Sequence, residues 1–516
     1  MKQKFTSTIA GASIFISMLL LLSRGLGFIR EMVFANNFGL GKEFDLYLVG
    51  AVLPVTINVI VLYIGQNFFV PGFQKINSSG TEESQIYYNQ SFILFIGGGA
   101  IVALILFFLS DTIISLYMHT ASVESRITAT QIFKIFLLTI PFSAGISMLS
   151  ALLQTAFEFK YPSISVLFLN ISVISMLFIF TNMIGIYVIP IGYLIGTILQ
   201  FYYLHLKSRK YFKLNLIPHI RQFSQMKSVF GSSILIILLI ETISQLYFIL
   251  DRYFYGSISP GGIASLNYAY IIFLLPISIF SISLATAVFP KISKAINDSS
   301  NNELERIYNE SISINIFIFM PITFILFYFG DTIIKMAFER GKFLAESTSI
   351  TYAALKCYSV SIVFYSVYSV LNKIFYSINL AKVLLAITVV GMIIKIVLNF
   401  LLVENFQQYG LASSTSISYL FFFLVSFLVI SNKLRIRQKN LFFKDFFIYL
   451  INCCLCFLTM HIIKNILPLR SIVTEMTMMV LFVVLYLLNL FLIKHNSISV
   501  FETVLRRLNL IGITKV

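Results

Sequence analysis

The chain has 516 residues, of which 58% are hydrophobic and only 11% are charged. Soluble proteins carry about 25% charged residues, so this chain lacks the side chains for a water-facing surface, and a soluble enzyme is excluded. The net charge of +16 would indicate nucleic-acid binding in a soluble protein, whereas in a membrane protein it first indicates cytoplasmic loops.

Long apolar runs follow one another along the whole chain, each near the ~20 residues that a spanning helix needs. They favour a helical bundle over a β-barrel, whose strands alternate over about 10 residues. The first run is too long for a signal peptide and leads into Arg24 and Arg30, so it is a helix of the mature protein. The pattern predicts an all-α polytopic membrane protein with fourteen transmembrane helices, near residues 8–33, 44–70, 88–109, 127–156, 162–181, 185–206, 228–254, 262–289, 311–329, 348–376, 381–402, 410–431, 446–466 and 472–493.

The basic residues concentrate in alternate loops. When the N-terminus is placed in the cytoplasm, most of the loop Lys and Arg residues fall inside, most densely over Lys207–Lys227 and Lys433–Lys444. The positive-inside rule therefore predicts that both termini are cytoplasmic. Topology explains the Lys207–Lys227 segment, with contact to anionic lipid as the alternative. Because the charge is spread over short loops, no nucleic-acid partner is expected.

Sequence stretches in the first half recur at nearly one spacing in the second half. The matching pairs are Phe107–Ile114 with Phe327–Ile334, Leu53-Pro54 with Leu275-Pro276, and Val70-Pro71 with Phe289-Pro290. The repeated unit holds six predicted helices, an even number, so the two copies point the same way across the membrane. Parallel repeats of this kind build transporters, whose substrate lies between the halves.

The repeat predicts how the chain is organised. An N-terminal lobe is expected over residues 1–222 and a C-terminal lobe over 223–440. Residues 441–516 supply two extra helices and a cytoplasmic tail. The four cysteines all lie in apolar runs, so neither a disulfide framework nor a zinc site is expected.

Ionisable residues inside predicted spans are functional candidates, because each costs about 2.5–3.5 kcal/mol on insertion scales. Arg24, Arg30 and Glu31 lie on the first span within Ser23–Glu31. Arg24 and Glu31 share a helix face, and a bend at Gly25 and Gly27 would turn both arginines inward. A guanidinium fork matches the oxygens of a phosphate. The pattern favours anion binding, with a structural Arg–Glu pair as the alternative.

Further charges lie near span ends or in mid-span. Asp45 begins the second span and Asp251-Arg252 ends the seventh, where capping and snorkelling compete with a functional role. Lys134, Lys356 and Lys373 also lie near span ends, and we interpret them as side chains that snorkel to the membrane surface. Glu241 and Lys395 lie in mid-span, and Asn399 follows Lys395 on the same face. Paired, Glu241 and Lys395 could both stay charged, either as a cation-responsive site or as a static ion pair.

The stretch Ser23–Glu31, followed by Phe38-Gly39 and Phe44-Asp45, resembles the MurJ/MviN family of lipid II flippases, within the multidrug/oligosaccharidyl-lipid/polysaccharide exporter superfamily. Four later stretches agree in order and spacing: Asp251–Phe254, Leu266–Ala269, Thr286–Pro290 and Phe338–Phe343. Gly410–Thr415 resembles the start of the family's twelfth helix. The family also has fourteen helices.

The resemblance implies a transporter of the bacterial cytoplasmic membrane, not an enzyme. It implies that an undecaprenyl-pyrophosphate-linked saccharide, lipid II, moves from the inner to the outer leaflet by alternating access. The substrate binds in a cationic central cavity, and the two last helices form a groove for the lipid tail. A monomer is expected.

At residue level the resemblance makes Arg24 and Arg30 the pyrophosphate-binding arginines and Asp45 the acidic residue of the second helix. Two further cavity arginines of the family are replaced here by Asn58 and Ile271. This departure favours an alternative, a flippase for another undecaprenyl-linked repeat unit of a surface polysaccharide.

Some family members hold sodium with a carboxylate on the seventh helix and polar groups on the eleventh and twelfth. Glu241, Asn399 and Thr415 fall at the matching places, but Lys395 occupies a ligand position. An ammonium cannot ligate sodium, yet it can replace its charge. No cofactor is therefore expected, and a Glu241–Lys395 pair is predicted in place of the ion.

Two other classes of protein remain as alternatives. A membrane polymerase or glycosyltransferase needs catalytic carboxylates on a long external loop, and the longest external segment here, residues 330–347, is short. A multidrug antiporter of the same superfamily shares the architecture, but it gives no reason for paired arginines on the first span.

Overall fold

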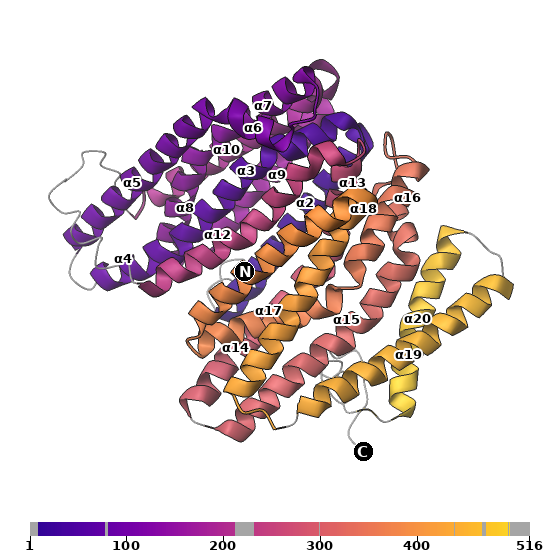
Figure 1. The fold of residues 1–516 in the computed structure, drawn as a ribbon. Helices are drawn as coiled ribbons and strands as arrows, with labels where there is room; N and C mark the ends of the chain where they lie inside the picture. Colours follow the sequence, from indigo (N-terminus) through magenta and orange to yellow (C-terminus); the bar gives the residue numbers. More distant parts are fainter. Residues whose placement is uncertain are drawn as a thin grey trace. The chain divides into compact units, whose positions relative to one another are not determined.

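The computed structural model describes residues 9–77, 81–211, 232–298, 300–437, 439–466, 471–493 and 495. Every regular element in these ranges is helical (Figure 1). The prediction of an all-α chain is therefore confirmed. The chain divides into two compact units, one of residues 1–264 with 338–344 and one of residues 265–337 with 345–516.

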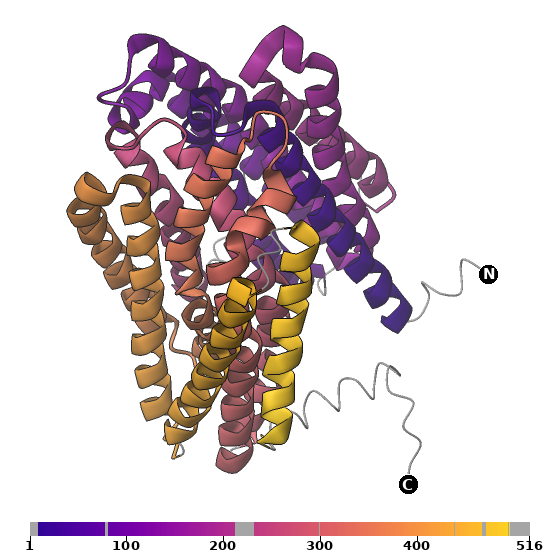
Figure 2. The same ribbon diagram turned by 90° about the vertical axis from the view of Figure 1, so that its right-hand side faces the viewer.

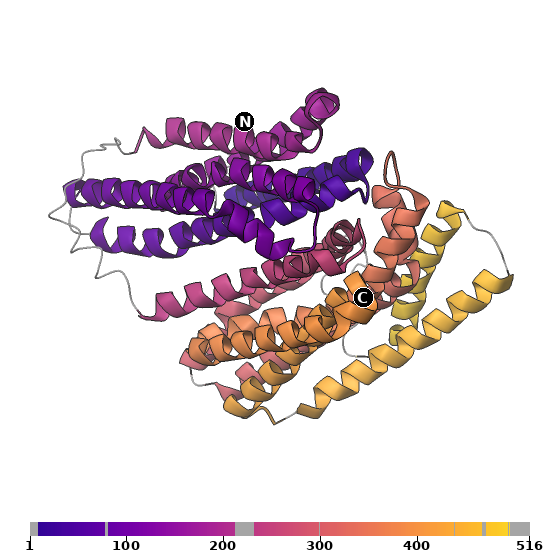
Figure 3. The ribbon, with the colours of Figure 1, turned by 45° about the horizontal axis from the view of Figure 1, so that its top comes forward.

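The first unit contains most of the helices of the N-terminal half. They are α2 (Ile9–Phe38), α3 (Lys42–Ile64), η1 (Gly65–Phe69), α4 (Val70–Asn77), α5 (Thr81–Phe108), α6 (Ser110–Tyr117), α7 (Val123–Leu137), α8 (Thr139–Thr155), α9 (Lys160–Ile184), η2 (Gly185–Tyr187), α10 (Val188–Ser208), α12 (Ser232–Tyr253) and η4 (Phe254–Ser257). Helix α9 packs on α10 and on α2, and α8 packs on α5 and α10. These helices run side by side in Figures 1 and 3.

Two apolar clusters hold the first unit together. One gathers aromatic side chains of η1, α4 and α5, among them Phe69, Phe73 and Tyr88, against α8. The other joins α3 to α6 and α7 through residues such as Val49, Ile114 and Phe133. Since lipid surrounds the bundle, such tight side-chain packing, rather than exclusion from water, stabilises helix pairs at membrane depth.

The second unit contains the remaining helices. They are most of α13 (Gly262–Pro276), η5 (Ile277–Ser281), α14 (Ile282–Asn297), α15 (Asn301–Phe338), α16 (Ala345–Ser359), α17 (Ile362–Ser377), α18 (Ala381–Lys433), α19 (Lys439–Ile466) and α20 (Ile472–Leu492). Helix α17 packs on α14 and α18, and α16 packs on α18. The pair α19 and α20 forms a hairpin, drawn in yellow in Figure 2.

Proline-bearing helices occur at the same place in both halves of the chain. Helix α3 contains Pro54 and runs through the π-helical segment η1 into α4. Helix α13 ends at Pro276 and runs through the π-helical segment η5 into α14. Proline removes a backbone donor, and the π-helical segment η5 directly after Pro276 accommodates the disturbed hydrogen bonding. Segment η1 begins farther along the chain from Pro54.

In the described part of the chain, nine helices are long and apolar enough to cross a membrane, or ten if α16 and α17, bent by 50°, form one span. Two of these stretches, Lys160–Ser208 and Ala381–Lys433, are far longer than one crossing. Gly185 interrupts the first with a φ of 55°. Gln407 interrupts the second with a φ of 49°. A multi-pass helical membrane protein is thus confirmed.

Wherever the predicted ranges are described, each overlaps one or more helices, although some helices, such as α15, extend well beyond their range. Gln407 falls in a predicted gap, whereas Gly185 is the first residue of the predicted range 185–206. The first unit includes α12, which the sequence prediction assigns to the C-terminal lobe. The part of the basic segment Lys207–Lys227 beyond residue 211, and the tail beyond residue 495, lie outside the described residues.

Candidate functional site

The two first-helix arginines have different surroundings. Helix α2 is uninterrupted from Ile9 to Phe38, so Gly25 and Gly27 do not break it. Arg24 is exposed, whereas Arg30 and Glu31 are half-buried. Arg24 therefore remains accessible, while Arg30 is set into the packing of the first unit.

Arg30 lies in a polar and aromatic cluster. Its Nη2 donates to Glu31 Oε1 at 2.7 Å, and its Nη1 donates to Asn170 Oδ1 on α9 at 3.1 Å. The guanidinium carbon lies 5.2 Å from the ring centroid of Tyr193 on α10 and 5.6 Å from that of Phe34. Its Nε is buried and has no hydrogen-bond partner among the described residues. The predicted Arg–Glu pair is present, and it fixes the guanidinium plane.

Asn170 was not singled out from the sequence. It is 4% exposed, and besides receiving the Arg30 bond it donates through Nδ2 to the Ser23 carbonyl at 3.4 Å. One amide thus contacts both ends of the Ser23–Glu31 stretch. The available signal was an asparagine within the apolar run of the fifth predicted span, because polar side chains at membrane depth commonly bond across helices.

Asp45 caps a helix from a distance. Its Oδ2 accepts from the Gly261 backbone N–H at 2.6 Å, and its Oδ1 accepts from the Ala264 N–H at 2.7 Å. Both donors belong to the start of α13, where backbone N–H groups lack helical partners and the helix dipole favours negative charge. Asp45 is 1% exposed. The capping interpretation of this residue accounts for both carboxylate oxygens.

Asp251 and Arg252 are also buried, at 7% and 9% exposed. The Arg252 charge acts on the Asp45 carboxylate from the end of α12. The first unit therefore brings three of the residues singled out from the sequence, Asp45, Asp251 and Arg252, into one buried region.

Asn58 occupies a position where the family resemblance predicts an arginine. Its Nδ2 donates to Thr139 Oγ1 at 2.7 Å, and its Oδ1 is buried without a hydrogen-bond partner among the described residues. Ile271 is half-buried on α13. At Asn58 the chain offers an uncharged acceptor instead of a cation.

The residues predicted to replace a sodium site lie in different units. Glu241, in the first unit, accepts from Gln245 Nε2 at 2.9 Å. Lys395, Asn399 and Thr415, in the second, are all buried. Ser414 donates to Asn399 Oδ1, and Thr415 donates to the Leu411 carbonyl. A buried ammonium beside an amide oxygen already in use is a poor donor set for sodium, so these residues do not fit the ion.

The Phe338–Phe343 stretch, in the first unit, contacts the end of α2. Lys342 N–H donates to the Asn36 carbonyl at 2.9 Å, and Phe338 packs on Phe28 at 5.8 Å between ring centroids. At Gly341, with a φ of 56°, an added Cβ would lie 2.3 Å from that same carbonyl. The stretch is therefore a packing element, and only glycine fits where the two segments meet.

Comparison with known proteins identifies the family. The family model described as lipid II flippase MurJ matches residues 34–489. The chain is 25% identical over 422 residues to a probable lipid II flippase MurJ of Borreliella burgdorferi, covering 79% of this chain and 80% of that one. It is 27% identical over 415 residues to the lipid II flippase MurJ of Thermosipho africanus, covering 79% and 82%.

Solved structures share the fold. A lipid II flippase MurJ in an inward closed conformation superposes with a TM-score of 0.78 at 22% identity, covering 92% of this chain and 97% of that one. An inward-facing multidrug resistance MATE transporter of the MOP superfamily gives 0.68 at 14% identity, covering 83% and 99%. Since the family model matches most of its length, this chain belongs to the lipid II flippase MurJ family.

Proposed function

We propose that this chain moves lipid II, an undecaprenyl-pyrophosphate-linked saccharide, from the inner to the outer leaflet by alternating access. Membership in the MurJ family makes the chain a lipid II transporter of the bacterial inner membrane rather than an enzyme. The structural observation that carries the residue-level proposal is the clamp on Arg30 by Glu31 and Asn170.

The contacts of Glu31 and Asn170 orient the Arg30 guanidinium for binding an anion. A guanidinium whose plane is already fixed loses little side-chain freedom when it forms paired bonds to a pyrophosphate. Glu31 holds one of the same N–H groups that a phosphate would use, so an arriving anion displaces that carboxylate and keeps the Asn170 bond. Arg24 is exposed and supplies the second cation. Asp45, engaged with α13, supports the site by fixing the second helix.

Fourteen crossings with both termini in the cytoplasm are part of this proposal. The cavity that gathers the starts of α15 and α19 with the end of α20 supports it. So do the contacts at the other end of α19, where Lys464 pairs with Glu475 at 2.7 Å. Helices α15 and α19 therefore run the same way, and α20 runs back between the same two ends.

The parallel six-helix repeat is likewise proposed, with lobes over residues 1–222 and 223–440 and extra helices over 441–516. A shared arrangement supports it. In the first unit Lys134 lies over the Phe107 ring and 3.5 Å from Asp111. In the second unit Lys356 lies over the Tyr352 ring, and the charge of Asp331 acts electrostatically on the same tyrosine.

A second candidate substrate is another undecaprenyl-linked repeat unit. The observation that favours it is Asn58, whose buried Oδ1 has no partner among the described residues. An amide oxygen suits a sugar hydroxyl rather than a phosphate.

For coupling we propose that no sodium is needed, because the Lys395 ammonium supplies the positive charge that a bound ion would otherwise bring. Strict sodium dependence of transport by the purified chain would contradict this proposal. We further propose that the chain is monomeric in the membrane, contacts membrane lipid and has no nucleic-acid partner.

Complementation of a cell depleted of its own lipid II flippase tests the function, with the leaflet accessibility of lipid II as the readout. The wild-type chain should restore growth, and Arg24→Ala or Arg30→Ala should abolish it at normal protein levels. Growth with either alanine variant would remove that arginine from the site. Failure of the wild-type chain, with protein correctly inserted, would favour the second substrate.

A further inference from the structure

A cavity of about 390 Å³ lies in the second unit, bounded by the start of α15, the start of α19 and the residues after α20. Its volume falls within the roughly 300–1,000 Å³ typical of small-ligand pockets. Its polar wall consists of Asn309, Glu310, Ser313, Lys444, Asp445 and His495. None of these residues belongs to the proposed transport site.

Hydrogen bonds fix one side of this cavity. His495 Nε2 lies 3.4 Å from Asp445 Oδ1, and Ser313 Oγ donates to Asp445 Oδ2. The buried hydroxyl of Tyr449 lies 3.3 Å from Ser313 Oγ and 3.4 Å from His495 Nδ1. The Asp445 side chain is only 17% exposed. A carboxylate is therefore held in place at the cavity wall rather than left mobile in solvent.

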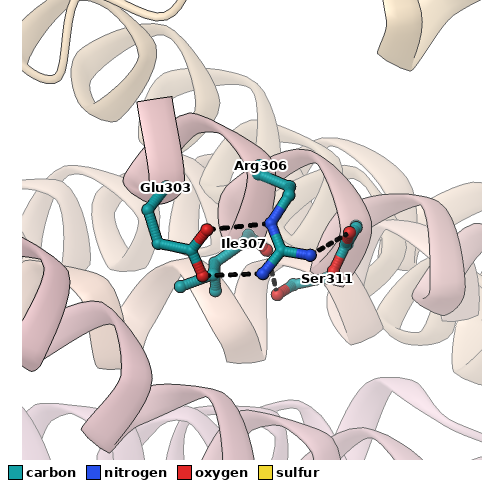
Figure 4. A network of polar contacts seen from close by, with 5 residues as sticks. Glu303, Arg306, Ile307 and Ser311 are labelled. Carbon is teal, nitrogen blue, oxygen red and sulfur yellow. Dashed lines mark hydrogen bonds and ion pairs between the residues drawn. The ribbon is translucent and has the colours of Figure 1, made fainter. Parts of the chain in front are cut away.

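Glu310 supplies a second carboxylate. Arg306 forms two bonds to Glu303, at 2.9 and 2.7 Å (Figure 4). It reaches Glu310 Oε1 only through one longer bond of 3.3 Å. The Glu310 side chain remains 53% exposed. It can therefore accept further hydrogen bonds from a cationic group in the cavity.

The rest of the cavity is apolar and continues onto a lipid-facing helix surface. Leu441, Phe442, Ile448 and Ile493 line it. Next to them on α19, Phe443 and Phe447 are 51% and 55% exposed. An acyl chain lying along α19 would cover these rings while its headgroup occupied the polar wall.

Charge complementarity selects among headgroups. The wall presents two carboxylates, Glu310 and Asp445, each contacted by one basic side chain, Arg306 or His495, beside one exposed lysine, Lys444. A primary ammonium has three N–H donors for the carboxylates, and a phosphate diester suits the lysine. A purely anionic headgroup would face both carboxylates, and a quaternary ammonium has no N–H to donate.

We propose that this cavity binds the headgroup of an inner-leaflet phospholipid that carries a primary ammonium next to a phosphate diester, with its acyl chains along α19 and α20. The bound lipid would join the C-terminal hairpin to α15. This site goes beyond the proposed transport of lipid II and does not depend on it.

Binding of dioctanoyl lipids to the purified full chain, measured by native mass spectrometry, tests the proposal. Dioctanoyl phosphatidylethanolamine should bind about tenfold more tightly than the phosphatidylcholine analogue, since only the former donates charge-assisted hydrogen bonds. Glu310→Gln should remove most of this preference. Lys444→Gln should weaken binding of both lipids, because both carry the phosphate.

Glu346→Gln is the matched control, since Glu346 is an exposed carboxylate of the same unit that lies outside this cavity, and its variant should leave the preference unchanged. Glu310 is exposed, so its variant should fold even if Asp445→Asn does not. Equal affinity of the wild-type chain for the two lipids would overturn the proposal. Tighter binding of dioctanoyl phosphatidylglycerol, or an undiminished preference in Glu310→Gln, would also overturn it.

Discussion

The guanidinium of Arg30 is shared among a carboxylate, an amide and two aromatic rings in the first unit. Each contact restricts the plane of the side chain, and together they leave the buried Nε without a partner among the described residues. A charge of this kind is costly at membrane depth. A half-buried cation at Arg30, close in sequence to the exposed Arg24, supports an anionic substrate.

Asn170→Leu should lower the free energy of unfolding by about 1–3 kcal/mol, because it leaves a buried N–H of Arg30 unpaired. Thermal unfolding of the detergent-purified chain measures the change. Asn182→Leu, on an exposed position of the same helix α9, is the control and should have little effect. Equal stability of the two variants would show that the Asn170 bond contributes nothing.

Asp45→Ala should destabilise the fold by about 0.5–2 kcal/mol, the range for loss of a helix cap. The reason is that two backbone N–H groups at the start of α13 lose their acceptor. Glu43→Ala removes an exposed carboxylate from the same turn of α3 and should be nearly neutral. Asp45→Asn retains an acceptor oxygen, so its unfolding midpoint should lie between those of Asp45→Ala and the wild-type chain.

At the scale of helices, the interruptions decide where one crossing ends and the next begins. Helices α9 and α10 follow each other almost without a loop, and the reversal depends on Gly185, with φ 55° and ψ −133°. A side chain at that φ is strained, whereas glycine adopts it readily. The sequence predicted a boundary between two spans just before Gly185, but it did not predict the backbone geometry.

Gly185→Ala should therefore lower stability by about 1–3 kcal/mol through backbone strain alone. Gly98→Ala, within α5, should instead stabilise by about 0.5–1 kcal/mol, since alanine loses less freedom in a helix. The added Cβ meets nothing within 4 Å at either position, so packing does not confuse the comparison. Midpoint shifts of the same sign in thermal unfolding would contradict this account.

At the scale of the whole molecule, the order of helices and the distribution of basic loops predict one topology. Helices α15 and α19 begin near the same cavity in which α20 ends. Spans that are joined by short connections run in alternate directions, so the start of α19 and the end of α20 lie on the same side. The predicted sides of the loops can be tested directly.

Glu124→Cys and Asn302→Cys, both at exposed positions, should react on opposite sides of the membrane. The background for both is the full chain with its four native cysteines replaced. A membrane-impermeant maleimide should label Glu124→Cys in intact cells and Asn302→Cys only after permeabilisation. Labelling of both in intact cells would require a different number of crossings.

The sequence alone determined that this is a helical membrane protein, where its helices lie, and which family it resembles. These properties follow from local apolar runs and short motifs, so no distant contact is needed to read them. The tertiary structure decided the partners of the singled-out charges. Arg30 bonds an asparagine 140 residues away, and Asp45 caps backbone groups 216 and 219 residues away. Backbone N–H groups carry no sequence signature, so only the folded chain shows that α13 takes the Asp45 carboxylate.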